Sequence, residues 1–329
     1  MYHIHNLAAL SDPRSVSARH RLRTDFADHG FAVFDNNGLA PEVLSDLYQR
    51  LLTFFALDES HKRVYERADG GHQRGHTPAR TERAVGQPPE AADLKEFWQD
   101  GPPNWQALAL QANLTTAWPA FDALRAQVYA TMRSRIDLVL GIIAPMLGVT
   151  PDWLVRYSAG GDDIARFLHY FPQRGLECVP GTLRSAKHTD INLLTALLTQ
   201  GPGLVVESTS GEHIALDIDA RHLVIQTGDM IEVLSGGLLP ATKHWVVNPD
   251  DPDSSRLSIA LFNHPAPLRW VDVLPHLHRA DHVFDGRTER SYTEERLIEI
   301  GILKGPPQFA HERASSGYPV PPAPWPDHI

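Results

Sequence analysis

The second half of the chain contains a series of short apolar segments. Runs of Val, Ile and Leu are separated every few residues by Gly, Pro, Asp and Ser, which is the composition of strands joined by turns. The segments are RFLHYF, INLLTALLT, GLVVES, EHIALDI, HLVIQT, DMIEVL, KHWVVN and RLSIALFN, between residues 166 and 263. Eight short strands of this kind favour a sandwich or barrel of the jelly-roll type.

Apolar residues in the first half recur with the spacing of helices instead. Residues 16–29, 41–57 and 116–147 each show this pattern, and Gly30 ends the first of them. One segment between the first two, FAVFD, is apolar throughout and predicts a strand. Helices followed by strands favour an α+β fold in which N-terminal helices pack against a β core.

We expect one unit over residues 1–329, because no internal repeat or linker interrupts the pattern. It divides into a mainly helical region at 1–150, a β core at 151–280 and a tail at 281–329. Polar residues 68–93 show no periodicity and predict a long loop, a kind of segment that is often functional. The tail has one helical candidate, in SYTEERLIEIGIL, and a Pro-rich end. It either packs on the outer surface or covers the barrel mouth as a lid.

Composition excludes several classes of protein. The chain has 30 Lys and Arg against 40 Asp and Glu, a formal charge of −10, which argues against a nucleic-acid or membrane-surface partner. Cys178 is the only cysteine, so no intrachain disulfide can form. The N-terminus shows no secretory signal and no run of about 18 apolar residues occurs, so we expect a cytoplasmic protein. We expect a monomer or homodimer that acts on a small molecule.

Two histidines and one aspartate have the spacing of a metal site. His188 and Asp190 are two residues apart at the head of an apolar segment, so on a strand they would share a face. His244 begins a later apolar strand. Two imidazoles and one carboxylate on one side of a metal form the facial triad of non-haem iron(II) oxygenases, which leaves positions open for oxygen and a co-substrate.

A second pair follows the third metal ligand. Arg256 and Ser258 are again two apart on an apolar strand, and they offer a guanidinium fork and a hydroxyl to a carboxylate. Each piece alone has an ordinary explanation: a solvated His–Asp pair, a hydrogen-bonded histidine, or a salt bridge at a sheet edge. The order His188-x-Asp190, His244, Arg256-x-Ser258 inside a series of short strands is specific.

These residues resemble a known family. HTDINLLTALLTQGPGLVVES, TGDMIEVLSGGLLPATKHWVVN and RLSIALFNHP are similar to the isopenicillin N synthase family of iron(II)/2-oxoglutarate-dependent oxygenases. The resemblance covers residues 166–268 well and the N-terminus more loosely. It implies a double-stranded β-helix, a distorted jelly roll, flanked by N-terminal helices. It also implies Fe(II), 2-oxoglutarate as co-substrate, O2, and release of succinate and CO2.

The resemblance assigns roles to individual residues. It implies that His188, Asp190 and His244 are the metal ligands, and that Arg256 and Ser258 anchor the far carboxylate of 2-oxoglutarate. In related halogenases a small residue replaces the carboxylate ligand. The carboxylate of Asp190 is present in this chain, which implies hydroxylation, desaturation or cyclisation.

Other positions depart from the family. An Asn-x-Tyr-Pro motif is replaced by HYFP, so that His169 and Phe171 stand at the Asn and Tyr positions, and we expect His169 or Tyr170 to bind the co-substrate. Within the loop GGHQRGHTPARTERA, Arg74 and His76 are candidates for contact with a substrate, as is Phe171 on the strand. Arg80 and Arg83 in the same loop could also face an anionic group.

Two alternatives stay open. In isopenicillin N synthase itself the Arg-x-Ser pair binds a substrate carboxylate and oxygen is the only co-substrate, so Arg256 and Ser258 do not prove the use of 2-oxoglutarate. A non-enzymatic β-barrel protein with a structural metal is the other alternative. A structural zinc site would normally close four protein ligands, and we find no fourth with suitable spacing.

Overall fold

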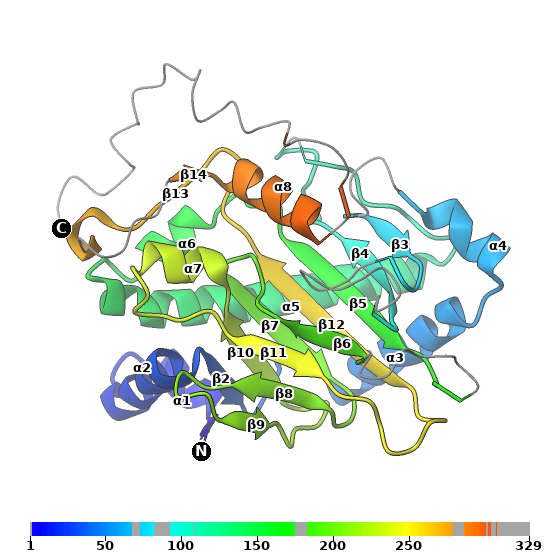
Figure 1. The fold of residues 1–329 in the computed structure, drawn as a ribbon, viewed down its shortest axis with the longest axis horizontal. Helices are drawn as coiled ribbons and strands as arrows, with labels where there is room; N and C mark the ends of the chain where they lie inside the picture. The colour runs from blue at the N-terminus through cyan, green and yellow to red at the C-terminus, as the bar shows by residue number, and fades with distance from the viewer. Residues whose placement is uncertain are drawn as a thin grey trace.

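Two β-sheets lie at the centre of the protein (Figure 1). The structure is a computed structural model that describes residues 2–67, 73–81, 93–108, 110–174, 183–278, 286–300, 302–303 and 307. Within these residues the larger sheet has eight strands in the order β1-β2-β10-β7-β12-β5-β4-β3, and the smaller sheet has four in the order β6-β11-β8-β9.

Strand neighbours are antiparallel except β1 and β2, which are parallel. The larger sheet contains β1 (Ile4–His5), β2 (Phe31–Phe34), β3 (Gly75–Thr77), β4 (Glu96–Asp100), β5 (Ile164–Tyr170), β7 (Leu194–Thr199), β10 (Leu223–Thr227) and β12 (Arg256–Asn263). The smaller sheet contains β6 (Ser185–His188), β8 (Leu204–Glu207), β9 (His213–Ala215) and β11 (Lys243–Val246), and a separate pair is formed by β13 (Trp270–Val271) and β14 (Arg287–Thr288).

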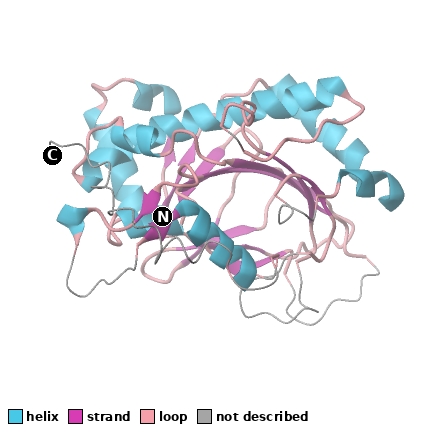
Figure 2. Cartoon of the chain, turned by 90° about the horizontal axis from the view of Figure 1, so that it is seen from above, coloured by secondary structure: helices cyan, strands magenta, loops and turns pink. Residues whose placement is uncertain are grey.

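Helices cover the outer face of the larger sheet, as Figure 2 shows. The long ones are α2 (Val16–His29), α3 (Pro41–Phe55) and α5 (Pro119–Ile143), at the three places where the sequence predicts helices. Helix α3 packs on β5, α5 packs on β7 and β12, and α2 packs on β2, in one large core. Gly30 ends α2 with a φ of 75°, a conformation that suits glycine. The short helices are α1 (Leu7–Ser11), α4 (Glu59–Lys62), α6 (Trp153–Tyr157), α7 (Asp229–Leu234) and α8 (Glu289–Glu299), with 3₁₀ turns η1 (Arg63–Tyr65), η4 (Ala144–Leu147) and η5 (Pro275–Leu277).

A second apolar core fills the space between the two sheets. It takes residues from both, for example Val206 of β8 and Val224 of β10. Because β7 has a core on each face, it is buried along its whole length and its sequence shows no polar alternation. The α+β fold with a double-stranded β-helix core and flanking helices is therefore confirmed. No helix in the described part of the chain is long and apolar enough to cross a membrane.

Three predictions about elements are wrong. DMIEVL is not a strand but the helix α7, because its buried residues Met230, Ile231, Val233 and Leu234 have helical spacing. Residues 68–93 are not all loop, since they include β3, while 68–72 and 82–92 lie outside the described residues. Finally, β6 ends at His188, so Asp190 lies in the loop that follows it rather than on the same strand.

Candidate metal and co-substrate site

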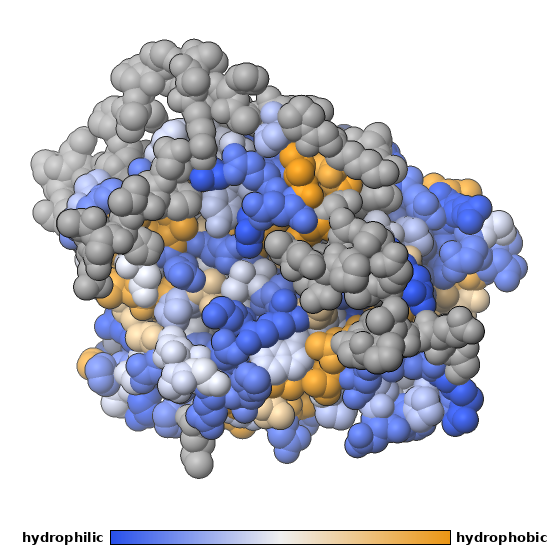
Figure 3. All heavy atoms as spheres, viewed as in Figure 1, coloured by the Kyte–Doolittle hydropathy of each residue, from blue (hydrophilic) through white to orange (hydrophobic). Residues whose placement is uncertain are grey.

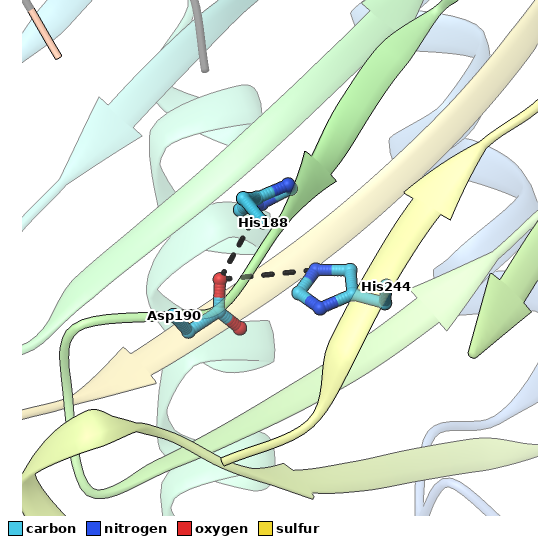
Figure 4. A group of neighbouring side chains, drawn as sticks. All are labelled: His188, Asp190 and His244. Carbon is cyan, nitrogen blue, oxygen red and sulfur yellow. Dashed lines mark ion pairs between the residues drawn. The ribbon is translucent and has the colours of Figure 1, made fainter. Parts of the chain in front are cut away.

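His188, Asp190 and His244 meet at one point between the sheets (Figure 4). His244 of β11 pairs in register with His188 of β6, and their ring centroids are 4.3 Å apart. The Oδ1 atom of Asp190 lies 3.7 Å from Nε2 of His188 and 3.8 Å from Nε2 of His244. One potential ligand atom from each residue lies within 4.8 Å of the others, so the three can coordinate a single ion.

Each of the three side chains is oriented by a further hydrogen bond. Nδ1 of His188 lies 2.7 Å from the carbonyl oxygen of Ala186, and Nδ1 of His244 lies 3.0 Å from that of Thr242. These contacts place the proton on Nδ1, so the lone pair of each imidazole is on Nε2 and faces Asp190. Nε2 of His244 also lies 3.2 Å from Nε2 of Gln226.

The carboxylate of Asp190 is held on its other side. Its Oδ2 accepts hydrogen bonds from Oγ1 of Thr195 at 2.6 Å and from Nε2 of Gln226 at 2.7 Å. Amides at the start of α7 hold the backbone of the loop, since Asp229 N donates to the carbonyl oxygen of Asp190 at 2.7 Å. A Cβ added at Gly228 would lie 2.2 Å from the carbonyl oxygen of Asn192, so only glycine allows this close approach.

Ionisation of the cluster suits a metal. Burial, together with the neighbouring His244, lowers the pKa of His188 to about 4, so its imidazole is neutral at pH 7. Burial would raise the pKa of Asp190, but the two imidazoles and the hydrogen bonds from Thr195 and Gln226 lower it below its usual value. Neutral imidazole and ionised carboxylate are the forms that bind a metal ion.

A small cavity of about 60 Å³ leads inward from the three residues. Tyr170, Arg256 and Ser258 line it, and Oγ of Ser258 lies 3.2 Å from Oγ1 of Thr199. The Arg256 side chain is buried, and its Nε and Nη2 have no hydrogen-bond partner. Its guanidinium lies 5.3 Å from the ring centre of Tyr170. A buried guanidinium with unsatisfied donors fits a carboxylate at the inner end of this cavity.

The structure corrects the prediction for His169. Side chains alternate along β5, so His169 faces the helices while Tyr170 faces the cavity. Nδ1 of His169 lies 3.0 Å from Oε1 of Glu96, and its ring stacks on Phe55 at 5.1 Å. His169 therefore does not contact a co-substrate in the cavity, and Tyr170 stays the candidate.

The three predicted substrate contacts line neither of the cavities that meet at the cluster. Arg74 is fully buried and forms an ion pair with Asp162. His76 is also fully buried, with Nε2 lying 3.1 Å from Oε2 of Glu96. Phe171 lies just beyond β5, with its ring 6.3 Å from that of His169. Arg74 and His76 therefore support the fold. Arg83, in the same loop, lies outside the described residues.

A larger cavity of about 500 Å³ opens on the outer side of the cluster. Its lining combines apolar side chains, including Ile164 and Phe262, with cations such as Lys95 and Arg166. The helix α8 forms one wall through Leu297 and neighbouring residues, and Figure 3 shows apolar surface gathered in the α8 region. Most of the rest of the tail lies outside the described residues.

Sequence reasoning missed several residues of the site. Thr195 and Gln226 hold Asp190, and Lys95 and Arg166 line both cavities. A signal for Gln226 exists, because it is a polar residue within the apolar segment HLVIQT, and β10 is buried throughout. Lys95 and Arg166 carry no comparable signal, because their position depends on how β4 and β5 pair.

Comparisons with known proteins agree with this geometry. A family model described as the 2OG-Fe(II) oxygenase superfamily matches residues 162–265, and one described as the N-terminal region of non-haem dioxygenases in morphine synthesis matches residues 4–120. The 2-oxoglutarate-dependent dioxygenase frbA of Dothideomycetidae sp. is 25% identical over 76% of this chain and 80% of its own length. The proline hydroxylase buaE of Petromyces alliaceus is 26% identical over 82% and 89%.

Solved structures show the same fold. A 2OG-Fe(II) oxygenase family protein from Caulobacter crescentus has a TM-score of 0.77 with 29% identity, over 91% of this chain and 99% of that one. The chain belongs to the 2OG-Fe(II) oxygenase superfamily, and it is an oxidoreductase of the 2-oxoglutarate-dependent dioxygenase class. Enzymes of this class use Fe(II), 2-oxoglutarate and O2, and the His-Asp-His cluster fits the iron.

Proposed function

We propose that this enzyme hydroxylates a C–H bond of a small molecule, with conversion of 2-oxoglutarate and O2 to succinate and CO2. The observation that carries the proposal is the position of the His188, Asp190 and His244 cluster between two cavities. The inner cavity ends at a buried guanidinium and suits a co-substrate. The outer cavity suits a substrate whose reacting carbon lies beside the metal.

The side chains have separate roles in this proposal. His188, Asp190 and His244 hold Fe(II), and Thr195 and Gln226 keep the carboxylate in place. The metal, when bound, supplies the activation of oxygen.

Co-substrate binding falls to the residues of the inner cavity. Arg256 and Ser258 bind the far carboxylate of 2-oxoglutarate, and Tyr170 forms the wall beside them. Because the metal-binding carboxylate is present, the arrangement supports hydroxylation or a related oxidation rather than halogenation.

The outer cavity limits the substrate. Its apolar surface and Arg166 favour a molecule with an apolar body and a carboxylate or other anionic group, whereas Lys95 is paired with Asp93 in the same cavity wall at 2.8 Å. Among the relatives, a proline hydroxylase is named for such a small carboxylate substrate. The screen described next therefore begins with free amino acids and small carboxylic acids.

Succinate release tests the proposal. Protein purified without metal is loaded with Fe(II) under argon, then mixed with 2-oxoglutarate, oxygen and each candidate, and succinate, oxygen uptake and oxidised product are measured. We expect one candidate to raise all three in equal amounts. Product formation with oxygen uptake but no succinate would instead indicate an oxidase that does not use 2-oxoglutarate. Absence of iron-dependent oxygen uptake with every candidate would contradict an oxygenase.

A further inference from the structure

Arg256 lines the small cavity, and a second buried arginine, Arg184, lies behind this lining. Arg184 and Arg256 are each 3% exposed. Arg184 precedes Ser185, which lines the cavity, and its Nη2 donates to the carbonyl oxygen of Ser254, two residues before Arg256. Burial lowers the pKa of Arg184, and the positive charge of Arg256 lowers it further.

Neither charge has an anionic partner among the described residues. The other two buried arginines do, since Arg74 pairs with Asp162 and Arg125 pairs with Asp100. Nε of Arg184, and Nε and Nη2 of Arg256, are buried donors without a hydrogen-bond acceptor.

A tyrosine beside Arg256 does not supply the missing charge. Tyr48 of α3 lies near Arg256, and its buried hydroxyl also has no hydrogen-bond partner. Burial raises the pKa of Tyr48, so this hydroxyl stays neutral at pH 7. Adjacent like charges without a counter-ion are unfavourable in a protein interior, so this end of the cavity is built for an anion.

We propose that Arg184 is a second cation for the far carboxylate of 2-oxoglutarate, and that it makes the cavity selective for 2-oxo acids with two carboxylates. The proposal rests on the proposed use of 2-oxoglutarate and adds a positioning residue to it. Arg256 meets the carboxylate directly, while Arg184 contributes charge from the side of β6. A 2-oxo acid that ends in a methyl group leaves both guanidiniums without a partner and binds more weakly.

Calorimetry with a ligand series tests the role of Arg184. Glutarate is titrated into the metal-free protein, and 2-oxoglutarate and 2-oxopentanoate are titrated into the Mn(II)-loaded protein under argon. We expect Arg184→Gln to weaken glutarate and 2-oxoglutarate about tenfold or more, as for the loss of a charge-assisted contact, and to leave 2-oxopentanoate unchanged. The matched control is Arg23→Gln, because Nε of Arg23 also donates to a backbone carbonyl, that of Ile142 at 2.9 Å, far from the cavity.

The outcomes separate this inference from the proposed function. If wild type binds 2-oxoglutarate and Arg184→Gln binds all three ligands as wild type does, or loses them equally, Arg184 is structural and the inference is wrong. If the wild-type protein binds glutarate but does not bind 2-oxoglutarate in the presence of metal, the proposed co-substrate is wrong. In that case, weaker glutarate binding by Arg184→Gln would still support the anion site. Should the Gln variant fail to fold, Arg184→Lys replaces it. Loss of the guanidinium fork should then weaken 2-oxoglutarate but not 2-oxopentanoate.

Discussion

At the scale of single residues, the metal cluster shows how hydrogen bonds select the form of a side chain. Carbonyl oxygens of Ala186 and Thr242 face Nδ1 of the two histidines, and Gln226 and Thr195 occupy one oxygen of Asp190. One nitrogen of each imidazole and one oxygen of the carboxylate are directed to the same point, where Nε2 of Gln226 also lies 3.2 Å from Nε2 of His244. The geometry for a metal is therefore present before any metal binds.

Removing one of these ligands should abolish turnover without unfolding the protein. We expect His188→Ala, Asp190→Ala and His244→Ala each to lose iron binding and succinate release, because two remaining ligands cannot hold the ion. Iron content, succinate and the thermal midpoint are measured for each. The control is His213→Ala, since His213 is an exposed histidine on β9 outside the cluster. Near-normal turnover in two of the three variants would show that the ligand assignment is wrong.

Arg256→Lys should weaken 2-oxoglutarate more than it lowers stability. A lysine keeps the charge but loses the planar fork, and a charge-assisted hydrogen bond is worth about 1.5–3 kcal/mol, or roughly tenfold or more in affinity. The Michaelis constant for 2-oxoglutarate should rise by that factor while the thermal midpoint stays near that of wild type. An unchanged constant would instead place a substrate carboxylate at Arg256.

At the scale of elements, β5 serves two regions at once. Tyr170 faces the cavity between the sheets, and His169, one residue earlier, faces the helices and a buried polar network. In this network Glu96 of β4 accepts hydrogen bonds from His169, from His76 of β3 and from Lys62 of α4. The network therefore joins three strands and a helix behind the wall of the cavity.

Helix α8 should control substrate binding but not co-substrate binding. Leu297 is 9% exposed and lines the outer cavity. We expect Leu297→Ala to raise the Michaelis constant of the substrate about tenfold or more, as for lost methylenes in an apolar pocket, and to leave that of 2-oxoglutarate unchanged. Because water then enters the cavity, more succinate should form per oxidised product. The control is Arg290→Ala, an exposed residue on the same helix that does not line the outer cavity. If both variants have the same Michaelis constants and the same ratio of succinate to oxidised product, α8 only packs on the outer surface and does not control substrate binding.

At the scale of the whole molecule, Glu96 should make stability depend on acid. Burial would raise its pKa, but hydrogen bonds from His169, His76 and Lys62 outweigh burial and lower the pKa to about 2, from an ordinary 4.5. A lowered carboxyl pKa contributes stability that is complete above the ordinary value and is lost as pH falls toward the folded value. The contribution should therefore be present at pH 7 and fade between about pH 4.5 and 2.

A comparison with Glu96→Gln isolates this contribution. We expect the variant to be less stable at pH 7 by about 1–3 kcal/mol, because Lys62 loses its buried carboxylate partner and keeps only the ion pair with the exposed Glu59 at 2.7 Å. The difference in thermal midpoint between wild type and variant should shrink as the pH is lowered from 4.5 to 2.5. Glu212→Gln, at an exposed position, controls for the loss of one carboxyl group. If the difference in thermal midpoint stays constant over this pH range, the pKa of Glu96 is not lowered by folding and the prediction is wrong.

Patterns between near neighbours in the chain determined the class of this protein. Strand composition, turn residues and helical spacing are local, so the β core and the three long helices could be predicted. The order of His188, Asp190 and His244 is also visible without coordinates, although Asp190 reaches the cluster from a loop and not from the predicted strand.

Only the tertiary structure decided which face each side chain occupies and what it meets there. A shift of one residue along β5 exchanges Tyr170 for His169 in the cavity, and a motif alone does not settle that register. Arg74 and Arg184 are both buried arginines beside loops, yet Arg74 pairs with the carboxylate of Asp162 while Arg184 donates to the backbone carbonyl of Ser254. The physical reason is that pairing, burial and charge compensation depend on segments far apart in sequence, whose contacts exist only after the chain has folded.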